Sequence, residues 1–169
     1  GSGAQARVSG IRIAIATDLI HGLSVGNGVS LRLGRMEYGA VGANAQRYAQ
    51  WLTQVLVPTI DARYRTVADA DGRAILGWSL GALSAFGIGW QYPELFGRVG
   101  AFSPSFWLAA DTRDANAVQA TRIVHALVDA SAPMSRPKLF FGVGTKEETD
   151  DRDGDGSIDV LDDARDLVD

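Results

Sequence analysis

The pentapeptide Gly77-Trp78-Ser79-Leu80-Gly81 decides the fold that this chain is expected to adopt. It follows the short apolar run 74–76 and precedes a helical segment of small residues, 82–86. In a G-x-S-x-G sequence with this context, the serine occupies a sharp strand-to-helix turn, and the flanking glycines leave room for that turn. The pattern therefore predicts a nucleophile elbow at Ser79. The alternative is a glycine-rich turn in which Ser79 only caps the helix.

The residues around Ser79 suggest how such an elbow would work. The backbone N–H of Leu80 would point at a carbonyl under attack and act as an oxyanion donor. Trp78, Phe106 and Trp107 are candidates for the wall of an acyl or aromatic pocket, with Trp78 and Trp107 taken as the pocket residues. Aromatic side chains beside strand ends also fill cores, and the sequence leaves that alternative open.

Composition restricts the class of protein. The chain has 169 residues, which is enough for one domain with a real core, and 46% of them are hydrophobic and 21% charged. The net charge of −4 gives no basic footprint, so no nucleic-acid partner is expected. No apolar stretch is long enough to span a bilayer, which favours a soluble protein. We expect a single domain over residues 1–169, with an atypical strand and a hairpin in residues 1–34.

Apolar strands alternate with amphipathic helices along the chain. The expected strands are 11–17, 74–77, 99–103 and 138–143, and the expected helices are 43–64, 82–90, 115–130 and 158–168. This alternation predicts an α/β fold, a three-layer α/β/α sandwich with a mostly parallel sheet. The strand 138–143 is very apolar, which favours a central place in the sheet. The run 23–33 around Asn27-Gly28 predicts the hairpin.

The helix 43–64 is expected to pack by one face and to kink or break at Pro58. That face is formed by residues at helical spacing, namely Tyr48, Trp51, Leu52, Val55 and Leu56.

Several longer stretches resemble one known family, in the family's order. They are Arg35–Tyr38, Val57–Thr66, the pentapeptide, Tyr92–Trp107 and Gly142–Glu147. The chain from about residue 35 to 168 is similar to the esterase D-type branch of the α/β-hydrolases, which includes enterochelin-esterase-like and feruloyl-esterase-like serine hydrolases. The resemblance implies a carboxylesterase-like serine ester hydrolase that acts on a small ester substrate.

The resemblance also implies where the other catalytic groups belong. The acid follows the strand 138–143 and matches Glu147, with Glu148 and Asp150 as close alternatives. The family's histidine comes after a further strand, but no histidine follows Glu147 here. We therefore expect an incomplete α/β-hydrolase that lacks the last strand and some early strands. The alternative function is a catalytically impaired or inactive fragment that acts as a binding or assembly module.

The chain has two histidines. His125 lies on the expected helix 115–130 and projects away from its apolar stripe, beside Arg122 and Asp129, so it is interpreted as a solvated side chain. His21 follows the first strand, at the carboxyl edge of the sheet, and is the candidate base within this chain. An ordinary loop histidine is the alternative for His21.

The segment 151–162 fits a twelve-residue calcium loop. Gly156 stands where the loop needs a sharp turn. The expected ligands are Asp151, Asp153, Asp155, Ser157 through its carbonyl, Asp159 and Asp162. Oxygen donors alone favour Ca²⁺ over zinc or copper, and we expect a structural ion. The alternative is a solvated acidic loop. A calcium site favours a secreted or periplasmic location.

The expected missing strands have a consequence for assembly. They would leave residues 139–141 on an open sheet edge that carries only Lys138 as a charge, and no early strand would lie beside the strand of Ser79. A homodimer is the expected result, and the alternative is that the hairpin at 23–33 folds back to cover the edges.

Overall fold

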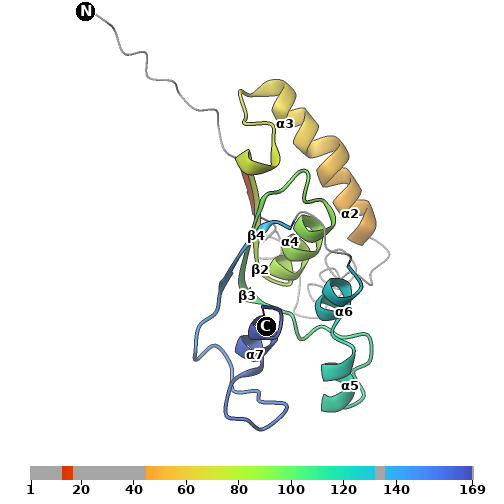
Figure 1. Ribbon diagram of the computed structural model, residues 1–169, viewed down its shortest axis with the longest axis vertical. Helices are drawn as coiled ribbons and strands as arrows, with labels where there is room; N and C mark the ends of the chain where they lie inside the picture. Colours follow the sequence, from red (N-terminus) through yellow and green to blue (C-terminus); the bar gives the residue numbers. More distant parts are fainter. Residues whose placement is uncertain (1–12, 17–44, 132–135, 169) are drawn as a thin grey trace, which may run out of the picture.

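The computed structural model describes residues 13–16, 45–131 and 136–168, and in these residues it forms one parallel sheet with helices (Figure 1). The strands are β1 (Ile13–Ala16), β2 (Arg73–Ser79), β3 (Arg98–Pro104) and β4 (Lys138–Gly142), paired in the order β1-β2-β3-β4. All three pairings are parallel. The expected α/β fold with a parallel sheet is confirmed, in the incomplete form that the sequence predicts. The expected hairpin at 23–33 lies outside the described residues.

The neighbours of β2 and β4 differ from the sequence predictions. β1 pairs with β2, with Ile13 opposite Arg73, so the expectation of no early strand beside β2 was wrong. β4 is the last strand of the described sheet rather than a central one. The strand is apolar on both faces because Leu139 and Phe141 pack against the core while Phe140, which is 61% exposed, contacts Phe102 with its ring tilted.

One long helical rod runs beside the sheet (Figure 1). It consists of α2 (Ala45–Trp51), a π-helical turn η2 (Leu52–Leu56) and α3 (Val57–Arg63). Pro58 therefore does not break the helix. It stands in the first turn of α3, where the N–H that proline lacks costs little, and the preceding turn takes the wider π pattern.

The buried face of this rod also differs from the prediction. Trp51 and Val55 are 48% and 51% exposed, while Ala49, Leu52 and Val57 are buried. The π turn adds a residue to the helix and rotates the following side chains, which a regular helical spacing does not anticipate.

The core lies between β2, β3 and the central helix α4 (Leu80–Gln91). Ile75, Val99 and Ala101 point to this face of the sheet and are at most 2% exposed. A Cβ atom on Gly89 would lie 2.3 Å from Val99, so glycine at this position lets α4 approach β3 closely. The rod, α4, α6 (Ile123–Asp129) and α7 (Asp159–Arg165) all contribute residues to this one buried cluster.

The other face of the sheet carries an aromatic row. Trp78 of β2 stacks on Phe102 of β3 at 4.8 Å between ring centroids, and Phe102 lies 5.6 Å from Phe140 of β4. Trp78 is 41% exposed. The described helices place their buried residues on the opposite face, so this row remains accessible to solvent in the described part of the chain.

A buried ion-pair cluster, Arg122–Asp163–Arg152, joins the C-terminal helices. They are α5 (Ala115–Ala120), α6 (Ile123–Asp129) and α7 (Asp159–Arg165). The expected single helix 115–130 is broken at Thr121 and Arg122. Arg122 leaves the helical conformation, and its guanidinium pairs with the fully buried Asp163 at 2.5 Å. Arg152 pairs with the same carboxylate. Tertiary charge pairing thus overrides helix propensity here.

A second buried ion pair fixes the start of β2. The short 3₁₀ helix η3 (Ala70–Gly72) is capped by Asp69 and leads into Arg73. Arg73 is 5% exposed and pairs with Asp61 of α3, which ties the rod to the sheet. None of the helices in the described residues has the length and apolar character needed to cross a membrane.

Candidate functional site

Ser79 lies where β2 ends and α4 begins, with its side chain exposed. Its backbone has φ 54° and ψ −125°, a conformation that non-glycine residues rarely adopt. The Ser79 side chain makes no capping hydrogen bond to α4. The strained strand-to-helix turn that the pentapeptide predicts is therefore present, and the helix-capping alternative is not what holds Ser79 there.

Leu80 is the first residue of α4, and its side chain is buried. Its N–H belongs to the first helical turn, where backbone donors have no partner four residues earlier in the helix. A helix N-terminus at the end of a strand is a favourable place for developing negative charge.

A β-bulge next to Ser79 brings in a residue that the sequence analysis missed. Trp78 pairs with Phe102 but Ser79 pairs with Pro104, so Ser103 is the extra residue of β3. Ser103 has φ 43°, also in the left-handed region. Bulges of this kind turn a side chain toward a new direction. Two serines flanking a proline at the end of an apolar strand are the signal in the sequence.

Ser105 contacts Ser79 from the same segment. The Ser105 N–H donates to the Ser79 carbonyl oxygen at 3.2 Å, and the two hydroxyl oxygens are 3.3 Å apart. Ser105 is 5% exposed, and Pro104 beside it is fully buried. The position of Ser79 is thus fixed from β3 as well as from its own turn.

Glu147 lies in the turn after β4, at the carboxyl edge of the sheet where the acid is expected. Its Oε1 accepts a hydrogen bond from the Ser103 hydroxyl at 2.9 Å and another from the Gly144 N–H. Glu148 instead accepts the Val160 N–H at 2.7 Å in the first turn of α7, and burial raises the pKa of its carboxyl group. Glu148 is therefore bound to the N-terminus of α7, while Glu147 contacts the end of β3 through Ser103.

The three aromatic residues that were expected to line the pocket differ in how far they are buried. Phe106 is fully buried and packs edge-on against Phe86 and Phe141, so it belongs to the core. Trp107 is half-buried against the same cluster. Trp78 is exposed beside Ser79 and stacks on Phe102.

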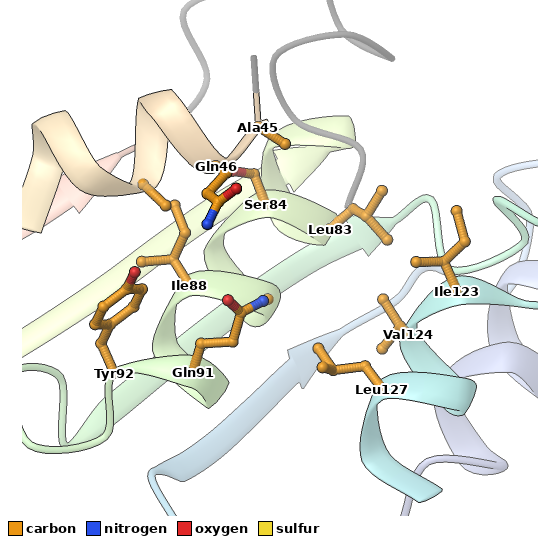
Figure 2. A pocket seen from close by; sticks show the side chains of 12 residues that line it. Ala45, Gln46, Leu83, Ser84, Ile88, Gln91, Tyr92, Ile123, Val124 and Leu127 are labelled. Atoms are coloured by element: carbon orange, nitrogen blue, oxygen red, sulfur yellow. The ribbon is translucent and has the colours of Figure 1, made fainter. Parts of the chain in front are cut away.

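A cavity of about 230 Å³ lies elsewhere, between α2, α4 and α6 (Figure 2). Its lining includes Leu83, Ile88 and Val124, with the Gln46 and Gln91 amides nearby. Neither Ser79 nor Glu147 lines this cavity. The candidate site is therefore an open part of the sheet edge rather than this hollow.

The histidines do not come together with Ser79 in the described residues. His21 lies outside them. His125 is half-buried on α6, and its Nε2 lies 3.1 Å from the Asp163 carbonyl oxygen. The prediction of a solvated His125 was wrong, because the break at Arg122 turns α6 so that His125 packs against α7.

Three carboxylates of the predicted calcium loop converge. Oxygens of Asp151, Asp153 and Asp155 lie within 4.8 Å of one another. Gly156 has φ 91°, and its N–H donates to Asp151 at 3.0 Å, which lowers the pKa of the Asp151 carboxyl group. Asp159 lies apart from the three and pairs with Arg152 at 3.3 Å.

The remaining two positions of this loop have other partners. Asp162 lies 3.6 Å from Arg165, and the Ser157 hydroxyl accepts a hydrogen bond from the same arginine at 3.2 Å.

The sheet, the turn at Ser79 and the edge residues define an incomplete α/β-hydrolase-like fold, and comparison with known proteins agrees. Residues 14–168 match the family described as "Putative esterase". The chain belongs to this esterase family.

Curated relatives match parts of the chain. A protein of Xylanibacter ruminicola called "Endo-1,4-beta-xylanase/feruloyl esterase" is 32% identical over 84 residues, which is 49% of this chain and 12% of that protein. Uncharacterized protein YjcH of Bacillus subtilis is 29% identical over 124 residues, 73% of this chain and 45% of the relative. The chain thus spans less than half the length of these relatives.

Solved structures give a coarser likeness. Enterochelin esterase of Shigella flexneri is 24% identical with a TM-score of 0.48, and the match covers 62% of this chain and 25% of that one. Siderophore hydrolase EstB of Aspergillus nidulans is 18% identical with a TM-score of 0.47, over 75% of this chain and 42% of that one.

His125 makes the stability of the chain depend on pH. Burial, together with the charge of Arg122, lowers the pKa of His125 below its ordinary value of 6.5. Between that lowered pKa and 6.5 the unfolded chain binds more protons, so the free energy of unfolding falls as the pH drops. We expect the urea midpoint to fall between about pH 7.5 and about pH 5.5, and to fall less in His125→Gln. An equal fall in both proteins would contradict this assignment.

Proposed function

We propose that the chain is the core of a serine ester hydrolase that acts on a small carboxylic ester. The observation that carries the proposal is the strained turn that exposes Ser79 at the carboxyl edge of the sheet in a member of an esterase family. The Ser79 Oγ would attack the ester carbonyl carbon, the alcohol would leave with a proton, and water would then hydrolyse the acyl-serine.

The other groups have distinct roles in this proposal. The Leu80 N–H would hold the oxyanion, and Trp78 and Trp107 would flank the acyl group. Glu147 would orient the imidazole that takes the serine proton. His125 is engaged at α7, so His21 is the candidate base within this chain.

A second candidate function is a binding or assembly module that keeps the hydrolase geometry with impaired catalysis. The observation in its favour is that, across residues 45–131 and 136–168, no histidine is hydrogen-bonded to Ser79 or Glu147. A serine without a base is a weak nucleophile.

We expect this chain to hydrolyse p-nitrophenyl acetate slowly, because a serine without an assigned base is a weak nucleophile. Ser79→Ala should lower the rate to the level that oxyanion donors and substrate binding supply without a triad, about 10³-fold to 10⁴-fold above the rate in water. Ser84→Ala, a change in a buried serine of α4, should leave the rate unchanged. Initial rates of p-nitrophenol release provide the measurement.

The outcomes separate the two functions. A rate of hydrolysis that Ser79→Ala leaves unchanged contradicts the esterase proposal and favours the module. Fast hydrolysis that His21→Ala abolishes assigns the base to His21, while an unchanged rate in His21→Ala excludes it.

We further propose a structural Ca²⁺ in the acidic loop 151–162. The convergence of Asp151, Asp153 and Asp155 and the positive φ of Gly156 support it. The Ser157 carbonyl, Asp159 and Asp162 would complete the ligand set. Asp159 would then exchange its ion pair with Arg152 for the ion. The loop follows Glu147 directly, so the ion would stabilise the turn that carries the acid.

Calcium should raise the melting temperature by about 5 °C over the chain in EGTA, because an ion that binds only the folded chain stabilises it by mass action. Asp153→Asn combined with Asp155→Asn should abolish the shift, and Asp166→Asn, an acid outside the loop, should preserve it. Differential scanning calorimetry makes the measurement, and equal melting curves with calcium and EGTA reject the ion.

A homodimer is proposed as the assembly. β4 ends the described sheet with Phe140 61% exposed, and the aromatic row of Trp78, Phe102 and Phe140 is accessible on the same face. A second copy paired with β4 would cover the edge and Phe140. Light scattering at micromolar concentration should give twice the chain mass, and Phe140→Lys should halve it. A monomer at that concentration contradicts the proposal.

A further inference from the structure

We propose that Ser103 is a positioning residue that holds the acid Glu147, and that the β3 bulge exists to aim its hydroxyl. The inference rests on the proposed function, because it assigns Ser103 a role in that reaction. Ser103 touches neither Ser79 nor a reacting atom, so its effect acts through Glu147.

The sheet order places Ser103 where such a role is possible. β3 lies between β2, which carries Ser79, and β4, which leads to Glu147. The segment that ends β3 reaches both neighbours, since Ser105 contacts Ser79 and Ser103 contacts Glu147. One short segment therefore connects the candidate nucleophile to the candidate acid.

Residues 103–105 at the end of β3 hold the Ser103 hydroxyl in a fixed position. Pro104 is fully buried, and Ser105 is 5% exposed. The Ser105 backbone donates to Ser79 and accepts from the Leu108 N–H at 3.2 Å. Ser103 projects from a backbone fixed on its C-terminal side, so its hydroxyl direction is set before any substrate binds.

The backbone conformation of Ser103 supports a role for its hydroxyl group in holding Glu147. Its φ of 43° is one that glycine adopts without steric cost and serine does not. Packing does not require a side chain here, because the residue is only half-buried. The contact that the serine makes is the hydrogen bond to Glu147.

The hydrogen bond selects one oxygen of the carboxylate. Both the Ser103 hydroxyl and the Gly144 N–H donate to Oε1. Among the described residues this leaves Oε2 as the oxygen that would face an imidazole. Two donors on one oxygen fix the rotation of the carboxylate, as supporting hydrogen bonds do in other preorganised sites.

The test compares Ser103→Ala, Ser103→Gly, Glu147→Gln and the double variant Ser103→Ala/Glu147→Gln, with Ser84→Ala as control. In the part of p-nitrophenyl acetate hydrolysis that depends on Ser79, both Ser103 variants should lower kcat roughly tenfold and change KM less than about twofold. Ser103→Ala should cause no further loss in the Glu147→Gln background. Ser103→Gly should melt above Ser103→Ala, because glycine relieves the strain.

We expect Ser103→Gly to melt at a higher temperature than Ser103→Ala and to have the same low kcat. This result would show that the loss of kcat comes from the missing hydroxyl group and not from a loss of stability. Independent losses that multiply in the double variant, or an unchanged kcat in both Ser103 variants, overturn the inference.

A second readout does not need catalysis. Ser103→Ala and Glu147→Gln should each lower the melting temperature, and the double variant should melt within about 1 °C of the lower single variant. Additive shifts, or no shift in either single variant, overturn the inference. If Ser79→Ala leaves hydrolysis intact, the proposed function fails, and this melting cycle still decides whether Ser103 holds Glu147.

Discussion

The backbone at Ser79 is the constraint on which the rest of the site depends. A non-glycine residue at φ 54° and ψ −125° costs about 1–3 kcal/mol and persists only where its surroundings hold it. Here β2 is paired on both sides, α4 is buried along most of its length, and the Ser105 N–H binds the Ser79 carbonyl. The packing that holds this turn is the same packing that forms the core.

The arrangement divides the sheet into two faces with different roles. One face packs against α4 and the helical rod and supplies the stability. The other carries the row Trp78, Phe102 and Phe140, which the described helices leave accessible. The carboxyl edge between these faces carries the serines and Glu147, as open parallel sheets place their ligand sites.

Local patterns in the sequence predict part of this arrangement. The positions of the apolar strands along the chain and the turn at Ser79 follow from short segments, because a strand-to-helix turn depends on neighbouring residues. The choice of Glu147 as the acid follows from the family resemblance. The break at Arg122 depends on Asp163, which lies far along the chain, so helical spacing alone predicts one helix. The exposure of Val55 and the burial of Val57 depend on a π turn, which regular helical spacing does not include. The Ser103 bulge depends on the register between two strands, which no single strand encodes.

Contacts with distant residues also set the positions of His125 and of Asp159 in the acidic loop. His125 has the spacing of a surface residue, but α6 packs against α7 through the buried Arg122–Asp163 pair. Asp159 stands at a ligand position of the proposed calcium loop, but its carboxylate pairs with Arg152.

We propose that the turn makes Ser79 the reactive serine of this chain. Incubation with a fluorophosphonate, followed by peptide mass spectrometry over time, tests it most directly. The account predicts that one adduct forms first on the peptide containing Ser79 and that Ser79→Ala abolishes it. Labelling of Ser103, Ser105 or other serines at the same rate, or no labelling at saturating probe, would contradict the account.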